Sequence, residues 1–247
     1  MPYIQLSTID TCPPDNLDKE TCKKKTEQYI EEIAEMQNIL YASQKKALLI
    51  ILQGMDCSGK DGAIKKVFTH VNPMGVKVYS FKKPSDEEFA HDFLWRIHKV
   101  CPDKGMIHVF NRSHYEDILI QRVHKWIDND TVLKRKESIN DFEKHLIRND
   151  TVILKFYLHI SKEEQLVRLE ERKTNPEKMW KYNAEDFKER EHWDQYMLAY
   201  EDAIDSCSKY AEWHVTPADK NWYKEYFVSK VVHQALKDMD LSYPTLS

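Results

Sequence analysis

The segment that most constrains the fold is residues 47–67, where the apolar run ALLIIL leads through QGMDCSGKDG into AIKKV. Gly54, Gly59 and Lys60 match the spacing G-x-x-x-x-G-K, which requires a strand before the loop and a helix after it. Backbone N–H groups of such a loop hold phosphate oxygens, and the lysine adds a positive charge. The chain has only five glycines, and three of them fall in residues 54–62. The segment therefore predicts a phosphate-binding loop between a buried strand and a helix.

Two carboxylates in this loop are unusual. Asp61 follows Lys60 at the position where nucleotide-binding loops usually carry Ser or Thr, and Asp56 lies four residues before Lys60. Carboxylates beside phosphates hold Mg²⁺, which binds one or two carboxylates together with phosphate oxygens. We therefore expect Asp56 and Asp61 to bind Mg²⁺. The alternative, which stays open mainly for Asp61, is a charge that is simply favourable at a helix N-terminus.

Composition excludes several classes of protein. Charged residues make up 32% of the 247-residue chain and the net charge is −4, so the chain is not expected to bind nucleic acid or a membrane surface generally. The five cysteines have no CxxC spacing, which indicates free thiols in a reducing cytoplasm rather than a disulfide framework or structural zinc. The chain shows neither a signal-peptide pattern at its start nor an apolar run approaching 18 residues.

The order of elements predicts an α/β fold. Residues 17–46 show helical spacing of apolar residues, after an irregular polar stretch over 1–16. Helical segments then alternate with strand-like runs, which indicates a five-stranded parallel sheet covered on both faces. The five strand-like runs are 47–52, 76–81, 106–110, 151–160 and 213–217. We divide the chain into an N-terminal arm and helix (1–46) and a kinase-type domain (47–247).

The third strand-like run ends in a second group of polar residues, FNRSHYED (110–117). Ligands of open α/β sheets bind at such strand ends. Arg112 is expected to donate paired hydrogen bonds to phosphate oxygens. Asn111 stands where many phosphate-loop proteins carry an Asp that positions the metal. Glu116 is either a carboxylate of the site or a charge at a helix N-terminus. In the preceding helical stretch HDFLWRIHK, Arg96 lies opposite an apolar face and is expected to reach an anion.

A basic segment over about 172–190 differs in composition from the rest of the chain. Most of its lysines and arginines fit a solvated helical face. Arg172 is the exception, because an insertion at this position forms the lid in chains that resemble nucleoside-monophosphate kinases. Arg168 and Lys181 belong to the same basic stretch, and Asp186 is either part of the site or the third residue of a helix capped by Asn183.

Taken together, these motifs resemble the polyphosphate kinase 2 family over about residues 17–240. The segments that carry the resemblance are GMDCSGKDG, FKKPSDEEFAHDFLWRIHK, FNRSHYED, RLEERKTNPEKMWKYNAEDFKEREHWDQYMLAYEDAI and WHVTPADKNWYK. The resemblance implies a three-layer phosphate-loop kinase fold of the thymidylate kinase type. It also implies Mg²⁺-dependent transfer of phosphoryl groups between inorganic polyphosphate and purine nucleotides.

The resemblance extends to individual residues. It places Asp56, Lys60 and Arg112 around the phosphates and the metal, and Arg172 in the lid. An Asn-Arg-Ser start together with Glu116 is similar to the class that phosphorylates both AMP and ADP, or the corresponding GMP and GDP. We expect phosphates or nucleotide to contact a larger set of residues, namely Gly54, Cys57, Ser58, Gly59, Lys60, Asp61, Gly62, Lys65, Lys66, Lys82, Arg96, Asn111, Arg168, Lys181 and Asp186.

Two rival functions remain at this stage. The first is an ATP-dependent nucleoside-monophosphate or thymidylate kinase, which would not respond to polyphosphate. The second is a non-catalytic module that binds nucleotide or polyphosphate, which the presence of Lys60, Arg112 and Arg172 disfavours. We expect a cytoplasmic homo-oligomer, a dimer or a tetramer.

Overall fold

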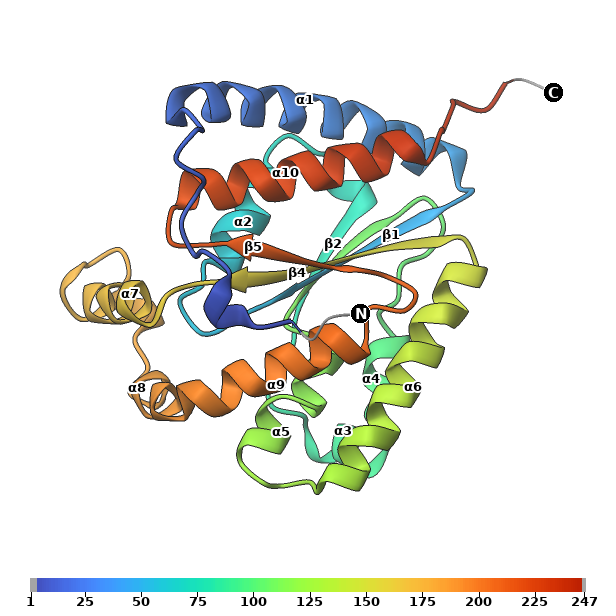
Figure 1. Ribbon diagram of the computed structural model, residues 1–247. Helices are drawn as coiled ribbons and strands as arrows, with labels where there is room; N and C mark the ends of the chain where they lie inside the picture. The colour runs from blue at the N-terminus through green and yellow to red at the C-terminus, as the bar shows by residue number, and fades with distance from the viewer. Residues whose placement is uncertain (1–3, 246–247) are drawn as a thin grey trace.

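The computed structural model describes residues 4–245 as three layers, with a parallel sheet between two layers of helices (Figure 1). The sheet contains β1 (Ala47–Gln53), β2 (Val76–Ser80), β3 (Ile107–Asn111), β4 (Thr151–His159) and β5 (Trp213–Pro217) in the order β2-β3-β1-β4-β5. All neighbouring strands pair in parallel. The five strands expected from the sequence and the three-layer α/β fold are therefore confirmed.

Helices cover both faces of the sheet. One face carries α1 (Lys19–Ser43), α2 (Lys60–Val67) and α10 (Asn221–Asp238), and the other carries α6 (Asn129–Arg148) and α9 (Trp193–Ser206) (Figure 1). The remaining α-helices of residues 4–245 are α7 (Lys162–Thr174) and four short ones, namely α3 (Asp86–Ala90), α4 (Trp95–His98), α5 (Ile120–Val123) and α8 (Glu185–Glu189). Among residues 4–245, no helix combines the length and the apolar character needed to cross a bilayer.

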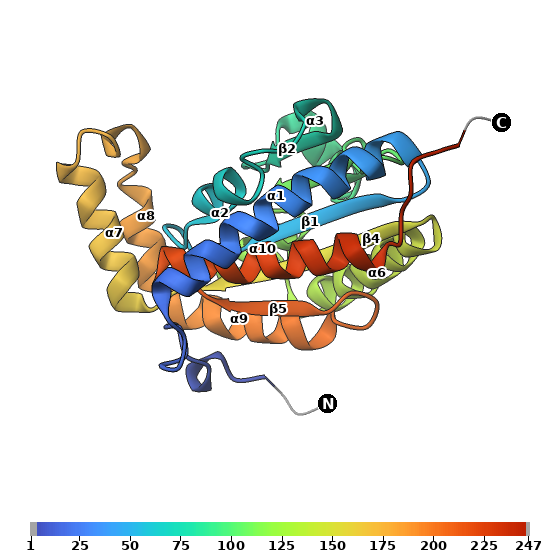
Figure 2. The same cartoon turned by 90° about the horizontal axis from the view of Figure 1, so that it is seen from above.

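The central strand explains why the core forms where it does. Every residue of β1 is buried, since β1 lies between β3 and β4 and is covered on both faces. The predicted helix over 17–46 is α1, whose buried residues include Ile30, Ile33 and Leu40 and which runs alongside α10 (Figure 2). The first helix therefore packs against the main core.

The irregular segment before α1 is also attached to this unit. Leu6 is buried, and its N–H donates to Oε1 of Glu201 at 2.7 Å. The ring of His159, at the end of β4, lies 3.1 Å from the carbonyl oxygens of Leu6 and Ile9. These contacts hold residues 6–9 against β4 and α9.

Helix starts follow the expected capping chemistry. The Ser85 side chain accepts from the N–H of Glu88, and Glu88 accepts from the Ser85 N–H, so a capping box is present at α3. Asp18 caps α1 by accepting from the N–H of Thr21 at 2.7 Å.

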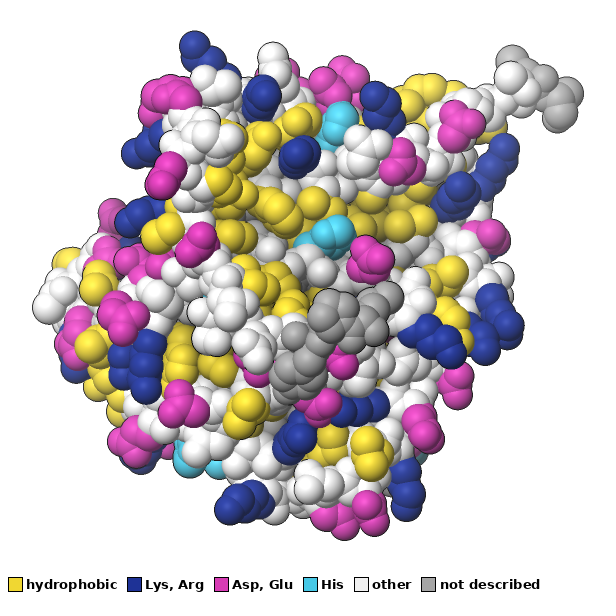
Figure 3. Space-filling view, viewed as in Figure 1, with side chains coloured by type: hydrophobic (Ala, Val, Ile, Leu, Met, Phe, Trp, Pro, Cys, Tyr) yellow, Lys and Arg dark blue, Asp and Glu magenta, His cyan; other side chains and the backbone are white. Residues whose placement is uncertain are grey.

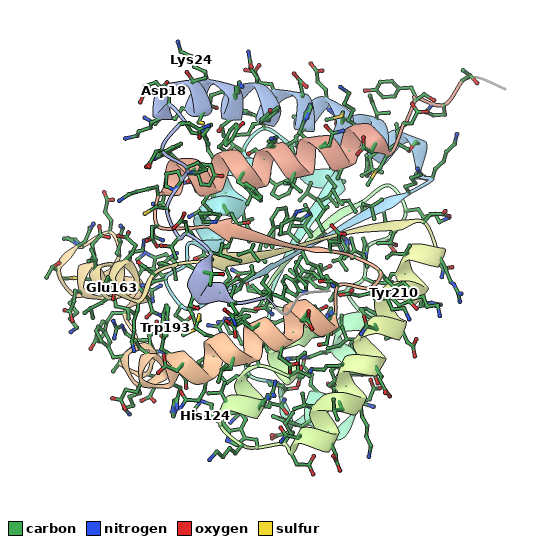
Figure 4. All side chains as sticks on the ribbon, in the orientation of Figure 1. Asp18, Lys24, His124, Glu163, Trp193 and Tyr210 are labelled. Carbon is green, nitrogen blue, oxygen red and sulfur yellow. The ribbon has the colours of Figure 1, made fainter. Side chains whose placement is uncertain are left out.

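The start of α1 and Glu163 on α7 lie at the end of the molecule toward which β4 and β5 point (Figure 4).

Apolar side chains gather in a band over α10 on the face seen in Figure 3 and are bordered by charges of both signs. Partly buried residues of α10 such as Phe227, Val231 and Ala235 pack against the core from this helix. A contact between copies of the chain on this band would fit the homo-oligomer expected from the sequence, which stays a prediction.

Candidate active site

The loop between β1 and α2 has the backbone geometry that its glycines predict. Gly54 has φ of 147°, Gly59 has φ of 93°, and Cys57 adopts the left-handed region with φ of 65°. A Cβ at Gly54 would lie 2.7 Å from the carbonyl oxygen of Leu158 on β4, so this position also needs glycine for space. No side chain caps the start of α2. The first N–H groups of α2 are therefore open to an anion.

Lys60 folds back over this loop. Its Nζ donates to the carbonyl oxygens of Gly54 at 2.7 Å and Met55 at 3.2 Å. Burial, followed by repulsion from Arg112, lowers the pKa of Lys60 to about 8. The ammonium is thus held by neutral acceptors at the place where a phosphate would bind.

Arg112 reaches the loop from the neighbouring strand. Because β1 and β3 are adjacent, Leu52 pairs with Asn111, and the Arg112 N–H donates to the Leu52 carbonyl at 3.0 Å. Its guanidinium donates to Asp56 in the loop and lies 3.5 Å from Oε2 of Glu116. The adjacency of the two strands brings Arg112 to the phosphate loop.

These contacts set the charge of the site. Glu116 raises the pKa of Arg112 against the effect of burial, so the guanidinium stays charged. Burial opposes ionisation of Asp56, but the positive charges of Arg112 and Lys60 hold its pKa below the ordinary value. At neutral pH the site therefore presents an ionised Asp56 next to a fixed cation.

Asp61 connects the loop to the segment that follows α7. Its Oδ1 accepts from Nδ2 of Asn111 at 2.8 Å, and its Oδ2 accepts from Nζ of Lys181 at 2.5 Å. Burial opposes ionisation here as well, but the hydrogen bonds and charge of Lys181 keep the pKa of Asp61 low. Lys181 lies in the segment between α7 and α8, which projects from the end of the sheet (Figure 1).

Arg172 organises the inside of this projecting segment. Its guanidinium donates to Oδ2 of Asp186 at 2.7 Å and to the carbonyl oxygen of Lys181 at 3.2 Å. The Asn183 side chain donates to Asp186 and accepts from the N–H of Glu185. Asp186 thus serves as the partner of Arg172, and α8 begins at Glu185 rather than directly after Asn183.

The loop, the end of β3, α7, the residues that follow α7 and the start of α10 line a cleft of about 750 Å³. The predicted site residues that line it are Asp56, Cys57, Gly59, Lys60, Asp61, Gly62, Lys65, Asn111, Arg112, Arg168, Arg172 and Lys181. Ser58 is fully buried beneath the loop. Arg168 also lines the cleft. Its guanidinium donates to the carbonyl oxygens of Cys57, Ala218 and Asp219, and these hydrogen bonds connect the loop to the segment just before α10.

Three residues that are expected to contact anions do not line this cleft. The Arg96 guanidinium is buried, donates to the Lys82 carbonyl at 3.0 Å and lies 3.5 Å from Asp117, so it supports the core beside β3 instead of the cleft. Lys82 is exposed outside the cleft-lining set. Lys66 points from α2 toward α1, where it pairs with Glu27 at 2.5 Å. Helical spacing alone did not reveal these internal partners.

Lys224 on α10 lines the same cleft and was not among the predicted site residues. Its side chain lies over Gly59, where a Cβ would come within 2.1 Å of the lysine Nζ. The lysine is the last residue of the segment WHVTPADKNWYK, which carries part of the family resemblance. That segment was the available signal, but the spacing in sequence does not show that α10 returns to the phosphate loop.

The parallel sheet, the phosphate loop after β1 and the cations of a lid define a phosphate-loop phosphotransferase. The sequence model of the polyphosphate kinase 2 family matches residues 16–244. The chain therefore belongs to the polyphosphate kinase 2 family and is an enzyme that transfers phosphate.

Individual relatives agree with this assignment. The chain is 46% identical to an AMP/ADP-polyphosphate phosphotransferase of Meiothermus ruber over 213 residues, which is 86% of this chain and 80% of the relative. It is 42% identical to an ADP-polyphosphate phosphotransferase of Rhodopseudomonas palustris over 87% of this chain and 79% of the relative. The crystal structure of polyphosphate kinase 2 from Arthrobacter aurescens TC1 is similar, with a TM-score of 0.96 and 40% identity over all of this chain and 90% of that one.

Proposed function

We propose that this chain transfers phosphoryl groups between inorganic polyphosphate and purine nucleotides, and that it uses both AMP and ADP as acceptors. The observation that carries the proposal is the closure of one cleft by the phosphate loop, Arg112 from β3 and the lid cation Lys181. The name of the Meiothermus ruber relative, an AMP/ADP-polyphosphate phosphotransferase, supports the choice of substrates. The lid is the segment 172–190.

The reaction exchanges one P–O bond for another. An anionic phosphate oxygen of the nucleotide attacks the terminal phosphorus of polyphosphate, and the bond from that phosphorus to the next bridging oxygen breaks. The nucleotide gains one phosphate, and the polyphosphate leaves one unit shorter. A phosphate ester is already largely ionised at neutral pH, because its second pKa is about 6. The protein therefore needs no general base, and its main task is to position and neutralise phosphates.

The cations of the cleft perform this task. Lys60 and the open N–H groups of α2 hold donor phosphate oxygens in place of the loop carbonyls that Lys60 contacts now. Arg112 is fixed by Asp56 and Glu116, so its charge is oriented before substrates bind. Arg172, held by Asp186, is the corresponding cation of the lid.

The carboxylates fit Mg²⁺. Among residues 4–245, no cluster of three or more His, Cys, Asp or Glu side chains could hold a metal by itself. This agrees with Mg²⁺, which binds one or two carboxylates and completes its shell with phosphate oxygens and water. Asp56 and Asp61 have lowered pKa values and are ionised, as metal ligands must be. When bound, Mg²⁺ would neutralise charge on the reacting phosphates.

Use of AMP depends on Glu116 in this proposal. Oε2 of Glu116 lies 3.5 Å from the Arg112 guanidinium. When the Gln53 side-chain amide is oriented so that its oxygen and its nitrogen both have hydrogen-bond partners, its nitrogen donates to Oε1 of Glu116 at 2.9 Å. This second carboxylate contacts Nη1 of Arg112, whereas Asp56 accepts from Nη2. AMP lacks the β-phosphate through which ADP can reach the cleft, so a fixed Arg112 matters more for AMP.

The test is a transfer assay on the purified protein. It combines AMP or ADP with Mg²⁺ and polyphosphate and identifies the product nucleotides by chromatography. The proposal expects ADP and ATP from AMP, and ATP from ADP, with no other donor present. Transfer from ATP to a nucleoside monophosphate without any response to polyphosphate would replace the proposal with the ATP-dependent kinase.

A further inference from the structure

Lys224 is a buried cation with few partners. Its side chain is 1% exposed, and its Nζ donates to the neutral Oδ1 of Asn221 at 2.7 Å. No carboxylate oxygen of residues 4–245 lies within 4.0 Å of this Nζ. An ammonium without a paired charge is costly to bury. Such a group in the wall of a cleft indicates a site completed by an anion from outside the protein.

The position of Lys224 strengthens this argument. A Cβ at Gly59 would lie 2.1 Å from Nζ of Lys224, and one at Gly62 would lie 3.8 Å from it. Both glycines belong to the start of α2, where the open N–H groups carry the positive end of the helix dipole. A nitrogen of the Arg168 guanidinium lies 3.5 Å from the same Gly59 Cβ position. Two cations at the positive end of a helix repel each other unless a negative group lies between them.

Burial, followed by repulsion from Arg168, lowers the pKa of Lys224 to about 8, and the carboxylate of Glu225 offsets this only in part. Lys224 therefore gains charge stabilisation when an anion binds beside it.

A second cleft of about 560 Å³ continues from this point along α10 and α1. It shares Glu164, Arg168, Asn221 and Glu225 with the cleft of the active site. Its other charged lining residues are the lysines Lys19, Lys23, Lys66 and Lys220 and the carboxylates Glu27 and Asp219. A donor that is a chain of phosphates has a path from the phosphate loop past Lys224 into this second cleft, whereas AMP is too short to use it.

We propose that Lys224 is a second donor-binding lysine, which contacts a phosphate of the polyphosphate chain over Gly59. The inference rests on polyphosphate being the donor, as proposed above. The same positive site would also attract the phosphates of a nucleotide, so its test has separate arms for the two ligands.

The test measures binding and turnover in Lys224→Met, a variant that keeps the length of the side chain and removes the charge. Calorimetry with tripolyphosphate should show Kd raised by about tenfold or more, which is about 1.4 kcal/mol. The Kd for AMP should stay within about twofold, as should both values in the control Lys230→Met, which removes an exposed lysine of the same helix. Since the change removes a buried unpaired cation, Tm should stay equal or rise.

A second variant tests the site without removing the lysine. Asn221→Asp keeps the size of the side chain and places a carboxylate on Lys224, which should weaken tripolyphosphate binding and leave AMP binding unchanged. Tripolyphosphate affinity that is unchanged in both variants, or equal losses of tripolyphosphate and AMP, would overturn the assignment. Failure of the proposed function is seen separately, as wild-type protein that binds tripolyphosphate but transfers no phosphate from polyphosphate to nucleotide.

Discussion

Replacing Glu143 with glutamine should reveal how strongly the turn that carries Arg112 is anchored. Glu143 and Lys155 are both 0% exposed, and their side chains meet at 2.6 Å. The other carboxylate oxygen of Glu143 accepts from the Tyr115 hydroxyl at 2.7 Å, and Lys155 also contacts that hydroxyl at 2.9 Å. Tyr115 stands between Arg112 and Glu116 in sequence, so this buried group anchors the turn that carries both residues.

Glu143→Gln keeps the shape of the side chain and leaves the Lys155 ammonium buried without its counter-charge. Breaking a buried ion pair in this way costs about 3–5 kcal/mol in the free energy of unfolding. For a chain of this size, each kcal/mol corresponds to about 2–4 °C, so Tm should fall by about 6–20 °C. Urea unfolding followed by circular dichroism measures the first quantity, and a thermal scan measures the second.

The double variant Glu143→Leu with Lys155→Met is the matched control. Removing both charges leaves neither one unpaired, so most of the lost stability should return. The kcat of the double variant should nevertheless be about tenfold or more below that of the wild type, because the Tyr115 hydroxyl loses both partners that position the turn. A loss below about 1 kcal/mol in Glu143→Gln, or a double variant as unstable as the sum of the single changes, would refute this reasoning.

Four further results are expected. Lys60→Ala should lower kcat by about 100-fold or more with an unchanged circular dichroism spectrum, and near-wild-type turnover would exclude the role assigned to the lysine. Asp56→Asn should raise the Mg²⁺ concentration for half-maximal activity more than Asp61→Asn does, while negligible effects of both would place the metal elsewhere. Glu116→Ala should reduce kcat/KM for AMP more than for ADP, and equal losses would make Glu116 a general residue of the site. In the free enzyme Lys60 loses its proton as pH rises through about 8, so kcat/KM for polyphosphate should fall above that pH; a flat profile to about pH 10, near the ordinary lysine pKa, would contradict the assignment.

Local sequence predicted the parts of the fold that depend on local chemistry. The continuous apolar run of β1 reports burial on both faces, and the glycines of the loop report backbone geometry that other residues adopt with strain. The polar residues after the third strand-like run marked the strand end that lies beside the phosphate loop. These features depend on short segments of the chain, so they can be recognised in a single sequence.

Features made by distant segments were not predictable in this way. Lys224 reaches the loop because α10 packs beside α2, and no periodicity in residues 221–238 reports that contact. The internal partners of Arg96 were not predictable for the same reason, since Lys82 and Asp117 come from different elements. The pair of Glu143 and Lys155 reads in sequence as two surface charges, although both are buried. Charged residues with buried partners require the tertiary structure to be recognised.

The most direct measurement of the central claim follows the transferred phosphate itself. Polyphosphate labelled with radioactive phosphate is incubated with purified protein, Mg²⁺ and unlabelled AMP, and the products are separated while turnover is still in its first cycles. The account predicts label in the β-phosphate of ADP, in step with the loss of one unit from the polyphosphate chain. Label released only as inorganic phosphate, or ADP formed only when ATP is supplied, would contradict it.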